Sequence, residues 1–191
     1  MAPFNIKTAS DDEIVDLCHQ IHKKDGGIED NPWGNLVVKL SDKIAVKIGL
    51  LQASEAAMQK LANETLHPGI VRIPKVYRFI QSARSGSSFG YIVMQYMPGR
   101  RLTDADLDPD SGKDIVLRLA TIVACLGQIR GSIPGPVDGG IPRDYVFGDE
   151  GAQSPFTSSE EMNAYMNKRL AYVNEYLHEQ TRGVQECVNS Q

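Results

Sequence analysis

The sequence has 191 residues, of which 41% are hydrophobic and 23% charged, and its formal net charge is −4. This balance is typical of a folded globular chain and excludes long-range disorder. Basic residues form no run and aromatic residues do not interleave with them, which excludes nucleic acid as an expected partner. No apolar stretch reaches the roughly 18 residues that a membrane span requires, and the first residues lack the pattern of a signal peptide.

The cysteines point to a reducing environment. Cys18, Cys125 and Cys187 are odd in number, lie far apart and form no C-x-x-C pair. Free thiols are typical of proteins inside the cell. We therefore expect a cytoplasmic protein with no membrane partner.

The first predicted element is a helix that begins after Ser10. Residues 10–13 form a capping box with Glu13, and apolar residues then recur at helical spacing until the chain reaches two glycines at 26 and 27. Two β-rich runs, 36–40 and 44–48, surround a short polar turn and predict a hairpin. Residues 53–63 predict a second helix.

A second hairpin is predicted from residues 75–80 and 89–96, around a Ser/Gly-rich turn at 82–88. Residues 111–130 predict a helix with a continuous apolar face, and a Gly/Pro-rich connection follows at 131–155. A capping box formed by Ser158 and Glu161 predicts a helix over 158–177, and residues 181–191 are expected to be a polar, frayed tail. The expected fold class is α+β.

Two charged residues of the first hundred suggest chemistry. Lys47 ends the strand Ile44-Ala45-Val46-Lys47, which is similar to the kinase V-A-I-K strand whose lysine contacts nucleotide phosphates. Glu55 follows on the next helix, where a carboxylate can hold that lysine in an ion pair. Lysines at strand ends and glutamates on helices are more often solvated surface charges. The two residues alone therefore leave both interpretations open.

A third segment favours a specific family. Residues 91–102, with the sequence YIVMQYMPGRRL, resemble the Y-I-V-M-E-Y-I-P-G-x-x-L hinge of aminoglycoside phosphotransferases and their choline-kinase relatives. Residues 74–77 resemble the P-x-V-Y strand of that family, and residues 154–158 resemble the G-P-F-x-S element of its large fungal branch. Together with the strand lysine Lys47 and the helix glutamate Glu55, these make five motifs, which occur in the family's order over roughly residues 30–177.

The resemblance implies a fold and a nucleotide site. It implies a helix at 1–29, a protein-kinase-like N-lobe with hinge at 30–99, a truncated and mainly helical C-lobe at 100–180, and a tail at 181–191. The backbone of Gln95 and Met97 would then contact an adenine edge, with Met94 behind it. The implied nucleotide-binding residues, with weak binding of ATP expected, are Lys47, Glu55, Met94, Gln95, Tyr96 and Met97.

The sequence also departs from this family. Phosphoryl transfer requires a positioning carboxylate and acidic Mg²⁺ ligands, which the family carries in an H-G-D-x-x-x-x-N loop. None of the four histidines begins a His-x-Asp motif. Asp144, Asp149 and Glu150 are expected to be solvated loop acids, and the turn at 41–43 has no glycine to wrap a phosphate. We therefore expect no catalytic residues, no Mg²⁺ site and no turnover by this chain alone. The sequence is interpreted as corresponding to the N-terminal half of the family fold only.

Three alternatives stay open. The chain could be a pseudokinase-type module that binds a nucleotide, or a protein partner through its exposed C-lobe helices. It could be an active phosphotransferase that missing sequence or another chain completes. It could also be an α+β interaction protein outside the family, which the absence of a strand lysine beside Glu55 would favour.

Overall fold

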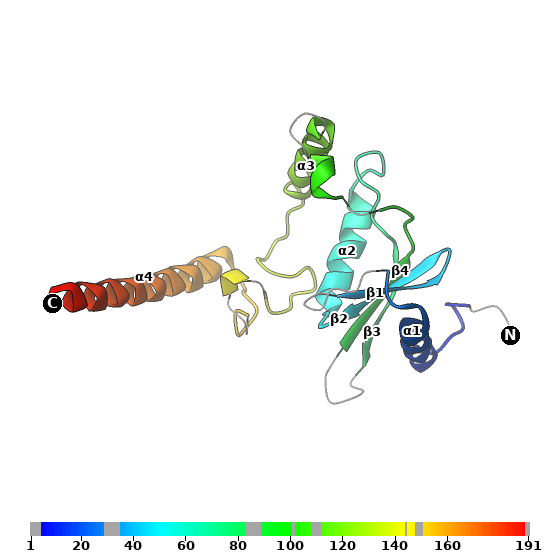
Figure 1. The fold of residues 1–191 in the computed structure, drawn as a ribbon, viewed down its shortest axis with the longest axis horizontal. Helices are drawn as coiled ribbons and strands as arrows, with labels where there is room; N and C mark the ends of the chain where they lie inside the picture. The colour runs from blue at the N-terminus through cyan, green and yellow to red at the C-terminus, as the bar shows by residue number, and fades with distance from the viewer. Residues whose placement is uncertain are drawn as a thin grey trace. The chain divides into compact units, whose positions relative to one another are not determined.

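A computed structural model describes residues 5–28, 35–82, 89–100, 102–107, 112–143, 145–147 and 151–189. The chain divides into two compact units, residues 1–130 and 131–191. Residues 83–88 of the predicted turn at 82–88 lie outside the described residues, as do Asp144, Asp149 and Glu150. Figure 1 shows the elements of each unit along the chain.

The first unit is built on a four-stranded antiparallel sheet. Its strands are β1 (Leu36–Ser41), β2 (Ile44–Gly49), β3 (Val76–Ser82) and β4 (Phe89–Gln95). They lie side by side in the order β1-β2-β4-β3, so β2 and β4 are the central strands. Helix α2 (Ala53–Thr65) connects β2 to β3. Both predicted hairpins are confirmed, and the α+β class with them.

Two helices cover opposite faces of this sheet (Figure 1). Successive side chains of a strand point to opposite faces, so Ile44, Val46 and Ile48 share one face of β2. Helix α1 (Asp11–Asp25) packs there, with Ile14 and Cys18 fully buried. On the other face a smaller cluster joins α2 to the sheet, and its buried and half-buried members are Leu51, Ala56, Ile92, Val76, Phe79 and Met94.

The predicted start and end of α1 are confirmed. Glu13 N–H donates to Ser10 Oγ at 3.3 Å, and Ser10 N–H donates to Glu13 Oε2 at 2.7 Å, which is the reciprocal pattern of a capping box. The Ser10 N–H, and after it the Ser10 hydroxyl, which donates to Glu13 Oε2 at 2.9 Å, hold the pKa of the Glu13 carboxyl below its usual value. The helix ends at Asp25, before Gly26, whose φ of 73° suits a glycine.

Helix α3 (Lys113–Leu126) is shorter than the predicted span 111–130. The helix stops at Leu126 because Gly127 follows it, and glycine favours helix ends. None of its helical residues is buried. The segment before it is fixed by a two-pronged ion pair, in which Arg100 donates to both carboxylate oxygens of Asp106 at 2.6 Å. This ion pair, with the Thr103 N–H and hydroxyl, holds the pKa of Asp106 well below its usual value.

The second unit contains helix α4 (Ser159–Asn189), and its length corrects one expectation. Residues 181–189, expected to be a frayed polar tail, continue the helix. This stretch contains no proline, and its Glu, Gln and Arg residues favour a helix, so a single glycine at 183 does not end it. An aromatic cluster lies near the start of α4, where the rings of Phe147, Phe156 and Tyr165 are 5.5–6.1 Å apart.

At the N-terminus of α4 the structure shows one of the two bonds of the predicted capping box, and the other bond has a different partner. Glu161 N–H donates to Ser158 Oγ at 3.2 Å, as expected. The Glu161 carboxylate instead accepts from the N–H and hydroxyl of Thr157, one residue earlier than in a capping box. Among the described helices, none is long and apolar enough to cross a membrane.

Candidate functional site

Lys47 lies on the central strand β2, where it pairs with Val37 of β1 and Ile92 of β4. Since paired residues share a face, Lys47 lies on the face of the sheet that α2 covers. Its side chain keeps 29% of its surface exposed. The Lys47 side chain is thus mostly covered by its neighbours and still partly open to solvent.

Glu55, in the first turn of α2, meets this lysine. Glu55 Oε2 lies 3.2 Å from Lys47 Nζ, and the carboxylate side chain is 44% exposed. The ion pair expected from the sequence is therefore present. A pair this exposed contributes at most about 1 kcal/mol to stability, because water competes for both groups. Its main effect is to fix where the ammonium lies.

A close backbone contact between the β2–α2 turn and β4, which the sequence analysis missed, positions Glu55 beside Lys47. The turn between β2 and α2 passes directly over Gly90 of β4, and a Cβ at residue 90 would lie 2.5 Å from the carbonyl oxygen of Leu51. Leu51 is 3% exposed and anchors the turn in the α2-facing cluster. A glycine inside a predicted strand is the signal that could have revealed it, since such glycines mark close backbone contacts.

The predicted hinge begins where β4 ends. Gln95 N–H donates to Lys75 O at 2.8 Å, and Tyr96 N–H donates to Lys43 O at 2.9 Å. Among the described residues, no hydrogen-bond partner is found for the backbone of Met97. Met94 is half-buried against the α2-facing cluster, where Gln59 Nε2 lies 3.5 Å from its sulfur. Met97 thus offers an N–H and a C=O that are free to bind a ligand.

Tyr96 ties the hinge to the β1–β2 turn. Besides the bond to Lys43 O, its ring lies 4.5 Å from Lys39 Nζ. Lys39 in turn binds Asp42 at 2.7 Å, and this hydrogen bond raises the pKa of Lys39 and lowers that of Asp42. The positive charge of Lys39 is therefore already paired within the turn.

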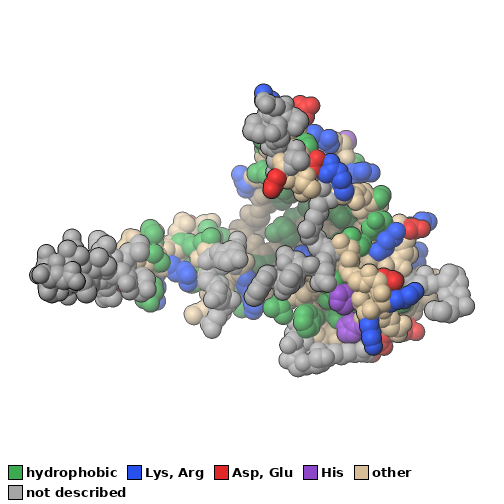
Figure 2. Space-filling model, in the orientation of Figure 1, with side chains coloured by type: hydrophobic (Ala, Val, Ile, Leu, Met, Phe, Trp, Pro, Cys, Tyr) green, Lys and Arg blue, Asp and Glu red, His purple; other side chains and the backbone are tan. Residues whose placement is uncertain are grey.

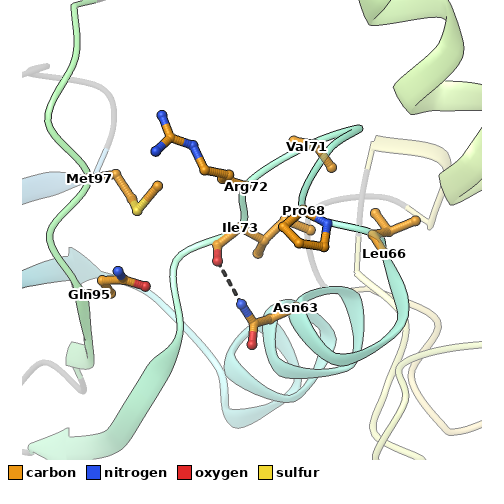
Figure 3. A pocket seen from close by; sticks show the side chains of 8 residues that line it. All are labelled: Asn63, Leu66, Pro68, Val71, Arg72, Ile73, Gln95 and Met97. Carbon is orange, nitrogen blue, oxygen red and sulfur yellow. Dashed lines mark hydrogen bonds between the residues drawn. The ribbon is translucent and has the colours of Figure 1, made fainter.

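A pocket of about 290 Å³ lies beside the hinge, between the end of α2, the loop that follows it and the end of β4 (Figure 3). Gln95 and Met97 line this pocket, whereas Lys47, Glu55, Met94 and Tyr96 do not. Lys47 pairs with Ile92, three residues before Gln95, which is about 10 Å along the strand. The ion pair and the hinge are thus neighbours on two central strands and do not share this cavity. The lining residues are Asn63, Leu66, Pro68, Val71, Arg72, Ile73, Gln95 and Met97.

No group of three or more His, Cys, Asp or Glu side chains that could hold a metal ion is found within the described ranges. Comparisons with family models, curated proteins and solved structures found no match for this chain. The family suggested by Lys47, Glu55 and residues 91–102 therefore stays a prediction.

Proposed function

We propose that the first unit binds a purine nucleotide as the N-lobe of an aminoglycoside-phosphotransferase-like protein does. Lys47 would contact the phosphates, Glu55 would position Lys47, and the backbone at Gln95–Met97 would contact the adenine. The observation that carries the proposal is the 3.2 Å ion pair between a central strand and the helix after it. Kinases use the same pairing of a strand lysine with a helix glutamate to hold phosphates.

The geometry of the ion pair suits a phosphate contact. An ammonium has three N–H donors, and one of them binds Glu55, so two remain for phosphate oxygens. The 29% exposure of Lys47 leaves its tip accessible to a ligand. The carboxylate also limits the rotamers of Lys47, which lowers the entropy lost when a nucleotide binds.

The hinge supplies the second contact. The free backbone groups of Met97 offer a donor and an acceptor, which match the hydrogen-bonding edge of a purine. Because Gln95 and Tyr96 are held by Lys75 and Lys43, the segment that carries Met97 is fixed in place. Gln95, where this segment begins, lies about 10 Å along β4 from Ile92, the strand partner of Lys47.

The proposal covers binding and does not include phosphoryl transfer by these 191 residues. Transfer requires a positioning carboxylate and acidic Mg²⁺ ligands. The sequence contains no His-x-Asp motif that would begin the loop in which this family carries them.

Calorimetric titration with Mg-ATP tests the proposal. We expect saturable binding that falls at least about tenfold in Lys47→Ala, since a hydrogen bond to a charged group contributes about 1.5–3 kcal/mol. Lys60→Ala removes an exposed lysine from α2 and should bind like the parent chain. Glu55→Gln should bind more weakly than Glu64→Gln, its control on the same helix. The proposal is wrong if millimolar Mg-ATP gives no binding or if Lys47→Ala keeps the parent affinity.

A further inference from the structure

The pocket beside the hinge is preformed by hydrogen bonds from α2 to the loop over residues 66–75. Asn63 Nδ2 donates to Ile73 O at 2.7 Å, which Figure 3 marks with a dashed line. One turn earlier, Gln59 Nε2 donates to Pro74 O at 2.9 Å. These bonds hold the loop wall against the helix without any ligand. Rigid walls of this kind are typical of small-molecule sites.

The lining combines apolar side chains with one unpaired charge. Arg72 is the only charged residue among the eight that line the pocket, and its side chain is exposed. Among the described residues, Arg72 has no hydrogen-bond or ion-pair partner. Figure 3 shows its guanidinium reaching from the loop toward Met97. The apolar lining residues are Leu66, Pro68, Val71, Ile73 and Met97.

A second polar group lies in the pocket apart from Arg72. The Gln95 side chain accepts a long, 3.5 Å hydrogen bond from Lys75 N–H through Oε1, while its amide nitrogen has no recorded partner in the described part of the chain. In Figure 3 Gln95 lies below Met97, and in this view Met97 lies between Gln95 and the Arg72 guanidinium. The pocket thus offers a cation at one end and an amide donor at the other.

We propose that this pocket binds a small carboxylic acid with an apolar body, its carboxylate on Arg72 and a hydroxyl or carbonyl oxygen on Gln95. Guanidinium pairs with carboxylate through two parallel hydrogen bonds, which makes Arg72 selective for that group. The volume of about 290 Å³ is at the lower end for ligand pockets, so the ligand is small. The pocket shares Gln95 and Met97 with the proposed adenine contact, whereas neither Lys47 nor Glu55, the proposed phosphate contacts, lines it.

The test uses 3-(4-hydroxyphenyl)propionate as a probe, with the corresponding alcohol, 3-(4-hydroxyphenyl)propan-1-ol, as the uncharged control. Methyl NMR of the full chain should show saturable shifts at Val71 and Ile73, with a Kd at or below about 1 mM. The core methyls of Val38 should not shift, because Val38 is 0% exposed on the far face of the sheet. The alcohol should bind about tenfold more weakly, since it loses the charged hydrogen bonds.

Two arginine variants make the test specific. Arg72→Gln should weaken the probe about tenfold and should fold normally, because the side chain is exposed. Arg118→Gln removes an exposed arginine from α3 and should leave the affinity unchanged. The proposal is overturned if the acid and the alcohol bind equally, if Arg72→Gln binds like the parent, or if Val71 and Ile73 do not shift. Lys47→Ala should keep the probe affinity, so this proposal and the nucleotide proposal can fail separately.

Discussion

Helices α1 and α3 belong to the same unit, but the more polar of the two, α1, is the one that buries its apolar side chains. α1 is rich in charged residues, yet Ile14, Val15 and Cys18 are at most 1% exposed. α3 is mostly apolar over Lys113–Leu126, yet Leu117 and Val123 are each 66% exposed. The difference is that α1 lies against a sheet face with matching apolar residues. Burial therefore depends on a complementary surface as much as on apolar content.

The same contrast appears in the second unit, where α4 exposes several large apolar side chains. Leu170, Tyr172 and Val173 keep 45–71% of their surfaces exposed. Figure 2 shows hydrophobic side chains on the surface of this helix. The stable core of the chain is thus the sheet with α1 and α2, and the substitutions below compare that core with α3 and α4.

The largest effect is expected from a leucine-to-alanine substitution in the core, compared with the same substitution on α3. Leu51→Ala should lower the free energy of unfolding by about 2–5 kcal/mol, because Leu51 is 3% exposed in the α2-facing cluster and its loss leaves a cavity. Leu117→Ala removes the same atoms from α3 and should change stability by less than about 0.5 kcal/mol. Urea unfolding followed by circular dichroism measures both. Equal losses would show that α3 is buried in solution.

The buried thiol of Cys18 gives an intermediate effect that depends on pH. Burial raises the pKa of Cys18 from 9.0 to about 12, so its folded thiol stays neutral where an unfolded one ionises. The contribution of Cys18 to the free energy of unfolding is therefore complete below pH 9. It is lost as the pH rises toward 12, by up to about 1.4 kcal/mol per pH unit. Unfolding measured between pH 8 and 10.5 should show this loss in the parent chain and not in Cys18→Ala.

Alkylation at neutral pH compares the buried core with α3 through one cysteine in each. Iodoacetamide should modify Cys125, which is partly exposed on α3, well before Cys18, which is 0% exposed. Peptide mapping by mass spectrometry reads each site separately. Equal rates would mean that the α1-facing core opens easily.

The smallest effect is expected at the helix caps. Ser10→Ala removes the hydroxyl that accepts from Glu13 N–H and should cost about 1 kcal/mol of global stability, because α1 is part of the core. Ser158→Ala makes the same change at α4 and should reduce helicity there without moving the unfolding midpoint of the first unit. Circular dichroism and urea unfolding separate the two results. A common shift in midpoint would contradict the division into two units.

The sequence predicted α1, α2 and the two hairpins of the first unit well because their signals are local. The Ser10–Glu13 capping box, the glycine after Asp25 and the alternating strands each depend on neighbouring residues. The pairing of Lys47 with Glu55 was also predictable, because one short turn joins their strand and helix. The binding roles of these residues stay predictions.

Other features could not be predicted because they depend on contacts between distant residues. The pocket forms only when the loop after α2 meets the end of β4, and no motif marks Arg72 as part of it. The hydrogen bond between His19 and Tyr91, at 3.1 Å, joins residues 72 positions apart. The full length of α4 was missed because polarity was taken as a sign of fraying, although polar residues form exposed helices readily.

The contact of the β2–α2 turn with Gly90 restricts which changes in chain length this fold can accept. An inserted residue between Gly49 and Ala53 would either lift Leu51 out of the cluster or rotate α2 by about 100°. Either change would carry the Glu55 carboxylate away from Lys47. Natural variation in loop length is therefore expected elsewhere in the chain, and these three connecting residues should be inherited as a fixed spacer.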